Sequence, residues 1–185
     1  MNLLRHLCMS LLCLPLLAHA AELKIDQGQG VITYRTDTLL ERDDVRTISV
    51  PADVAFHRAM HYRAIPLAAL LRETGPADHL QFVGNDGFSA EMPGALILNG
   101  RGSEAWLAIE DPARPWPALP GNHGSAGPFY VVWTRPQAAG VNPEQWPYQL
   151  ATIRKLDSVA DRFPAIRPDP SLPPDREVGR GFAVF

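Results

Sequence analysis

Residues 80–93 read LQFVGNDGFSAEMP, and this stretch predicts two short strands joined by a tight turn. Residues 79–83 and 88–92 are rich in residues that favour strands, and the Asp86-Gly87 pair between them is the strongest short signal for a β-hairpin. Other runs of the same kind lie between Gly, Pro and Asp residues, and we expect strands at 23–25, 31–34, 45–50, 105–110, 129–134 and 149–156.

Helical signals are fewer. Pro66 suits a first helical position, Leu67, Leu70 and Leu71 follow at helical spacing, and Gly75 acts as a stop. We therefore expect a short helix over 66–74 and a further helical turn or two over 54–61. The sequence as a whole predicts an α+β domain that is mostly β, with short helices.

The composition describes one folded domain. The chain has 185 residues, of which 46% are hydrophobic and 20% are charged, so it can bury a single core. Its formal net charge of −3 argues against a nucleic-acid partner, because proteins that bind along the phosphate backbone carry a basic face.

The first twenty residues have the pattern of a signal peptide. Arg5 precedes an apolar run over 7–17, and Ala18-His19-Ala20 is a small-x-small cleavage pattern. We expect cleavage before Ala21, which predicts a periplasmic or secreted protein with no membrane span after cleavage.

Both cysteines of the chain, Cys8 and Cys13, lie inside this segment. Residues 21–185 therefore contain no cysteine, which excludes a disulfide, a thiolate nucleophile, a thiolate metal ligand and covalent c-type haem attachment in the processed chain. The sequence divides into a signal peptide (1–20), a domain (21–160) and a tail or linker (161–185) that is rich in proline.

Five stretches carry a resemblance when they are taken in order: YRAIPLAALL at 62–71, LQFVGNDGFSAEMP at 80–93, AWLAIEDPARPWPALPG at 105–121, GSAGPFYVVW at 124–133 and LATIRKLD at 150–157. Together they resemble the sulfite-oxidase-type molybdopterin-binding domain family, over half to two-thirds of the processed chain. The resemblance implies that family's mostly β fold, reduced in size.

The chain also departs from that family. Its enzymes hold molybdenum through two pterin sulfurs and a protein cysteine thiolate, and residues 21–185 supply no cysteine. The chain is similar to short domains that precede a c-type cytochrome domain, and 177–185 (EVGRGFAVF) looks like the lead-in to one.

The resemblance therefore implies a non-catalytic binding or electron-transfer accessory module. Its expected partner is a c-type cytochrome or another periplasmic redox protein, and it needs no cofactor. Two alternatives stay open: a molybdopterin oxidoreductase with a non-cysteine metal ligand, and a periplasmic protein that binds small anions.

Five residues are candidates for ligand binding. The run GNHGSAG at 121–127 places His123, Gly124 and Ser125 where backbone N–H groups form an anion-binding nest. Asp86 edges the same cleft in this interpretation, although an Asp-Gly hairpin needs no ligand, and Arg63 clamps an anion unless it is simply solvated or ion-paired. No catalytic residue and no metal site are assigned; His57 and His61 have a spacing that metal sites use, but no third ligand.

Overall fold

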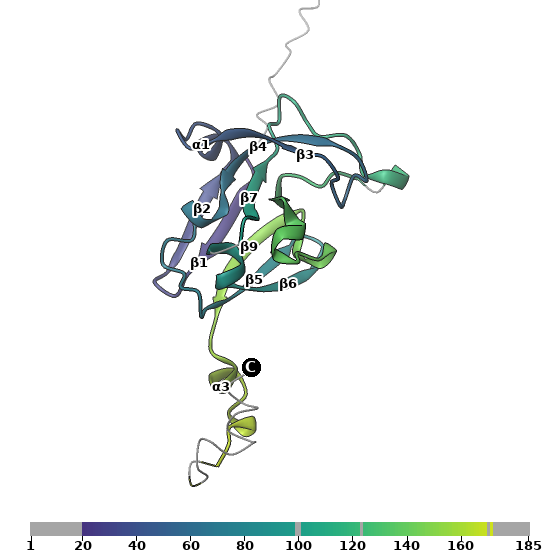
Figure 1. Cartoon of the computed structure of the whole chain (residues 1–185). Coiled ribbons are helices and arrows are strands. Elements are labelled where there is room, and N and C mark those ends of the chain that lie inside the picture. Colours follow the sequence, from purple (N-terminus) through teal and green to yellow (C-terminus); the bar gives the residue numbers. More distant parts are fainter. Residues whose placement is uncertain (1–19, 99–100, 123, 170, 172–185) are drawn as a thin grey trace, which may run out of the picture.

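The computed structural model describes residues 20–98, 101–122, 124–169 and 171, and two β-sheets make up its body (Figure 1). The larger sheet has the order β2-β1-β9-β5-β6 and the smaller one has the order β3-β4-β7-β8. The strands of the larger sheet are β1 (Glu22–Asp26), β2 (Val31–Arg35), β5 (His79–Gly84), β6 (Ser89–Pro93) and β9 (Leu150–Leu156). Those of the smaller sheet are β3 (Arg46–Val50), β4 (Met60–Pro66), β7 (Glu104–Ile109) and β8 (Phe129–Thr134).

The larger sheet consists of two antiparallel hairpins with one strand between them. β1 pairs with β2, and β5 pairs with β6 in the register that sets Phe82 opposite Ala90. β9 lies between β1 and β5, parallel to the first and antiparallel to the second. Its residues Leu150 and Ile153 are fully buried, so this strand belongs to the core.

The smaller sheet contributes more residues to the core than the larger sheet does. β7 and β8 are buried almost throughout, as expected for strands that are covered on both faces. Their buried side chains join those of β1, β5 and β9 in one hydrophobic cluster, so the two sheets share a single core.

The helices are short. They are α1 (Thr36–Leu40), α2 (Gly94–Leu98) and α3 (Val159–Arg162), and single 3₁₀ turns are η1 (Leu67–Ala69), η2 (Pro120–Asn122), η3 (Pro136–Ala139), η4 (Pro143–Gln145) and η5 (Pro164–Ile166). Among the residues described, no helix is both long and apolar enough to span a bilayer.

The helix expected over 66–74 is wrong, because only the 3₁₀ turn η1 forms there. Pro66 is still the last residue of β4, where it pairs with Trp106 of β7. The buried side chain of Gln27 then donates to the carbonyl of Leu70 and accepts from the N–H of Glu73. The backbone groups that a helix needs are therefore bonded to another part of the chain.

The helical turns expected over 54–61 are reduced to a single turn, in which the N–H of His57 donates to the carbonyl of Asp53 at 2.9 Å. The chain makes a tight turn there, with His57 at a φ of 53°, and β4 begins at Met60. The Asp53 carboxylate explains the turn, because its Oδ1 accepts hydrogen bonds from the N–H groups of Ala55 and Phe56.

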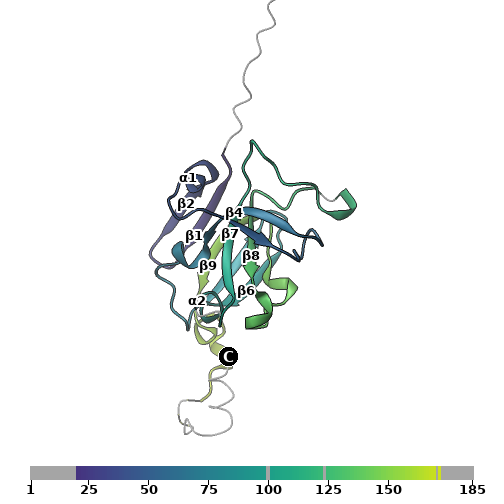
Figure 2. The same cartoon turned by 45° about the horizontal axis from the view of Figure 1, so that its top comes forward.

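The mostly β architecture with short helices is confirmed. The signal-peptide prediction falls on residues 1–19, and the expected cytochrome lead-in on 177–185, which are outside the described residues. Within the proline-rich tail, the described part contains the end of α3 and the 3₁₀ turn η5. In Figures 1 and 2 this segment leads away from the sheets beyond the end of β9.

Gly94, the first residue of α2, packs closely against the turn that precedes β5, and a substitution there tests this packing. A Cβ atom on Gly94 would overlap the carbonyl oxygen of Gly75 and lie 3.1 Å from Thr74 Cγ2. We expect Gly94→Ala to lower the free energy of unfolding by about 1–3 kcal/mol, because the backbone must move apart.

Gly75→Ala is the matched control, since its added Cβ meets only Asp78 Oδ2 at 3.6 Å. Chemical denaturation of the two variants measures the difference. Equal stability of both variants would show that α2 is not held this tightly.

Candidate functional site

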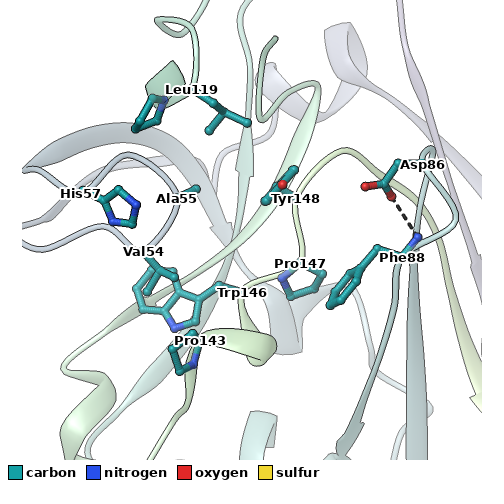
Figure 3. Close-up of a pocket in the computed structure, with 11 residues that line it drawn as sticks. Val54, Ala55, His57, Asp86, Phe88, Leu119, Pro143, Trp146, Pro147 and Tyr148 are labelled. Atoms are coloured by element: carbon teal, nitrogen blue, oxygen red, sulfur yellow. Dashed lines mark hydrogen bonds between the residues drawn. The ribbon is translucent and has the colours of Figure 1, made fainter. Parts of the chain in front are cut away.

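A pocket of about 390 Å³ opens where four connecting segments meet (Figure 3). The turn before β4, the β5–β6 turn, the loop around η2 and the segment from η4 to β9 each contribute side chains. The lining residues are Val54, Ala55, His57, Asp86, Phe88, Leu119, Pro120, Pro143, Trp146, Pro147 and Tyr148.

The walls are largely apolar, and the imidazole of His57 and the carboxylate of Asp86 lie apart. Trp146, Pro147 and Tyr148 form a continuous aromatic and proline surface, and Figure 3 shows His57 on one side of it and Asp86 on the other. Asp86 is exposed, and its Oδ1 accepts the N–H of Phe88 at 2.9 Å. The pocket therefore suits a ligand with an apolar body and a polar group at each end.

A buried carboxylate lies behind the His57 wall. Asp53 is 2% exposed, and besides the N–H groups of Ala55 and Phe56 it accepts the hydroxyl groups of Tyr62 at 2.8 Å and Tyr130 at 3.3 Å. Four donors thus replace the water that this carboxylate loses on burial. The arrangement fixes the turn that carries Val54, Ala55 and His57.

Burial raises the pKa of Tyr62 above its ordinary value of 10.0, and the charge and hydrogen bond of Asp53 raise it further. Burial followed by the charge of Asp53 also raises the pKa of Tyr130. Both phenols therefore stay protonated and continue to donate to Asp53.

The loop between β7 and β8 is closed by Glu110. Its Oε1 accepts the N–H of Trp116 at 2.8 Å and the hydroxyl of Ser125 at 3.1 Å. The hydroxyl of Ser125 in turn accepts the N–H of Gly127. The carbonyl of exposed Gly124 accepts the N–H of Leu119, so this loop supports the pocket through Leu119.

The predicted site residues are only partly brought together. Asp86 lines the pocket, Gly124 and Ser125 lie in the loop behind it, and His123 is outside the described residues. Arg63 follows Tyr62 in β4 and therefore faces the other side of the sheet, where it donates to the carbonyl of Leu40 at 2.6 Å.

Sequence reasoning missed the pocket's aromatic wall and considered His57 only as half of a metal pair. The available signal was the run Trp146-Pro147-Tyr148 directly before β9, in which Trp146 and Pro147 are buried and Tyr148 is half-buried. The role of this run as a pocket wall depends on β5 and β9 being neighbours in the sheet, and no local sequence pattern shows that pairing.

The described lining does not fit an anionic pterin cofactor. None of its residues is a cysteine, a lysine or an arginine, and it presents the carboxylate of Asp86. Molybdenum in the sulfite-oxidase type of site needs a soft thiolate, and a phosphate group needs cationic or N–H donors.

Comparison with models of known protein families finds no match, and comparison with curated proteins finds none either.

The Asp53 network makes a stability prediction. An amide at position 53 keeps one acceptor oxygen and places an NH₂ group where Oδ2 stands, so the hydroxyl of Tyr62 loses the acceptor to which it donates. We expect Asp53→Asn to lower the free energy of unfolding by about 1–3 kcal/mol. Asp43→Asn, at an exposed position, is the control and should change it by less than about 0.5 kcal/mol. Similar losses of stability in both variants would show that the hydrogen bonds of Asp53 do not stabilise the fold.

The raised pKa values of the two tyrosines predict alkaline instability. An unfolded chain releases the protons of Tyr62 and Tyr130 near the ordinary pKa of 10.0, whereas the folded chain retains them. The free energy of unfolding should therefore fall as the pH rises above 10.0. Tyr62→Phe should make that fall less steep, although the variant is less stable at neutral pH. Denaturation at several pH values measures both slopes, and identical slopes would contradict the assignment.

Proposed function

We propose that the chain is an exported, non-catalytic binding module on a reduced sulfite-oxidase-type molybdopterin-binding fold. The ordered sequence resemblance supports the fold, and the absence of cysteine from residues 21–185 supports the loss of the family's oxo-transfer chemistry. The mostly β two-sheet architecture is compatible with such a fold. By the same resemblance, the partner is a c-type cytochrome or another periplasmic redox protein.

The pocket beside β9 carries the binding function in this proposal. Its decisive feature is an apolar, aromatic wall with His57 and Asp86 at opposite sides. A small aromatic molecule that bears an amine matches this surface, because the ring packs against Trp146 and Tyr148 while the amine reaches Asp86. A small inorganic anion matches it less well, since no lysine or arginine belongs to the described lining.

A pocket-filling variant tests the binding site. Ala55 is half-buried in the pocket wall, so Ala55→Leu places three more carbon atoms in the ligand's space. Ala52→Leu is the matched control, because Ala52 is exposed and lines a different hollow beside Trp133. Binding of phenethylamine, benzylamine and benzoate is followed by NMR shifts of the tryptophan indole N–H signals.

We expect the amines to bind to the native chain and to Ala52→Leu but not to Ala55→Leu. Asp86→Asn should weaken amine binding about two- to fivefold, as is usual for an exposed ion pair, and leave benzoate unaffected. Equal binding to both leucine variants would place the ligand elsewhere. A preference for benzoate over the amines would reverse the proposed ligand class.

A second measurement addresses the cofactor. Protein purified from its own compartment should contain neither molybdenum, measured by mass spectrometry, nor pterin, measured by the fluorescence of its iodine-oxidised form. Stoichiometric amounts of both would contradict a non-catalytic module and favour the oxidoreductase alternative.

A further inference from the structure

Strand β2 is an outer edge of the five-stranded sheet, and its side chains are unusually apolar for an edge strand. In the described part of the chain only one of its two sides is paired, with β1. Val31 is 59% exposed and Ile32 is 48% exposed, and these are two of the four large hydrophobic side chains that the described residues expose. Figures 1 and 2 place the β1–β2 hairpin at the outer side of the body.

The opposite edge of the same sheet differs from β2 because it is protected. β6 carries Glu91 and ends at Pro93, and charged residues and proline both discourage a further strand from pairing. Arg162 at the end of α3 also reaches the Glu91 carboxylate at 3.5 Å. β2 contains no proline and no lysine, its only charged residue is Arg35 at its end, and its register with β1 is regular. An edge of this kind is open to a further strand.

The apolar face of the sheet continues through β2 to this open edge. On β1, Leu23 is fully buried and Ile25 is 1% exposed, and they pair with Tyr34 and Ile32 of β2. Paired residues lie on the same face of a sheet, so Tyr34 and Ile32 extend the buried face outward. Tyr34 is half-buried against the core, whereas Ile32 leaves about half of its surface in water.

We propose that β2 pairs with β2 of a second copy of this chain and joins the two five-stranded sheets into one. Identical strands that are related by a two-fold axis run antiparallel. When the pairing is centred on Thr33, Ile32 of each copy lies opposite Tyr34 of the other. A β-branched residue opposite an aromatic ring is a favourable cross-strand pair, and the symmetry supplies this pair twice.

The charges on the other face of the hairpin suit the same pairing. Arg35 lies at one end of β2, opposite Glu22, and Val31 lies at the other end, opposite Asp26. Antiparallel pairing about Thr33 sets Arg35 opposite Val31 of the second copy, with the second copy's Asp26 in the next strand. Arg35 then has an acidic residue on each side, so the edge is complementary to itself in charge as well as in shape. This self-complementarity favours a second copy over an unrelated strand.

The oligomeric state of the processed chain tests the proposal. Analytical ultracentrifugation from micromolar to millimolar concentration should show an equilibrium between monomer and dimer. Ile32→Lys should weaken dimerisation about tenfold or more, because the dimer loses the pair with Tyr34 twice and gains charges on its apolar face. Phe163→Lys is the matched control, since Phe163 is 51% exposed just beyond α3 and its replacement should leave dimerisation unchanged.

Two outcomes of this measurement would overturn the proposal. The first is a chain that remains monomeric over the whole range of concentration. The second is equal dimerisation of Ile32→Lys and Phe163→Lys, because the dimer would then form through a surface other than β2.

A cysteine placed at the proposed two-fold axis tests the register. Residues 21–185 contain no cysteine, so Thr33→Cys gives the processed chain a unique thiol. Residues directly opposite each other in antiparallel strands lie about 4.5–5.5 Å apart at Cα, a separation that a disulfide spans. Lys24→Cys is the matched control: Lys24 pairs with Thr33 within the hairpin, and its two copies would be three strand spacings apart, about 14 Å.

We expect Thr33→Cys to form a covalent dimer under mild oxidation about tenfold faster or more than Lys24→Cys, since the second separation is too long for a disulfide. Non-reducing electrophoresis measures both rates. Thr33 and Lys24 are both exposed, so neither substitution removes a buried side chain. Equal rates would contradict the pairing about Thr33. β2 contributes no residue to the described pocket lining, so failure of this proposal is distinct from failure of the proposed function.

Discussion

The carboxylate of Asp53 joins its own turn to two strands, one that follows closely in sequence and one that is distant. It accepts N–H groups from its own turn, a hydroxyl from Tyr62 in β4 and a hydroxyl from Tyr130 in β8. The turn, strands β4 and β8 of the smaller sheet and the rings of Tyr62 and Tyr130 are therefore held together by one group. Because the rings of Trp146 and Tyr148 contact Tyr130, the pocket wall depends on the same carboxylate.

Local patterns predicted the strands well and the helix poorly. The β5–β6 hairpin follows from Asp86-Gly87 alone, since a tight turn and its flanking strands are determined by neighbouring residues. The stretch after Pro66 has helical spacing, yet the side chain of Gln27 takes its backbone groups. A hydrogen-bonding partner 43 residues away cannot be recognised in a local pattern. Strand β4 was missed for a similar reason, because its pairing with β3 and β7 is tertiary.

Of the candidate site, the sequence predicted one lining residue, Asp86. A turn between two strands is exposed whatever the position of the sheet in the fold, so its side chains are available to a pocket. The other predictions rested on residue type, which does not show direction. Arg63 is an anion-binding residue by chemistry, but the alternation of β4 turns it away from Tyr62 and toward Leu40. Ser125 bonds to Glu110, a partner on the preceding strand's end that only the folded loop brings near.

The position of β9 has a consequence for how the protein folds. Strands β1–β2 and β5–β6 are hairpins that form locally, and in the part of the chain that the structure describes β9 is the strand that joins them, with Thr152 beside Lys24. Isolated two-stranded hairpins are marginally stable in water, and contacts so distant in sequence form slowly. During synthesis one edge of β1 and one edge of β5 therefore stay unpaired until β9 emerges. Until then the chain is most exposed to aggregation and most in need of a chaperone.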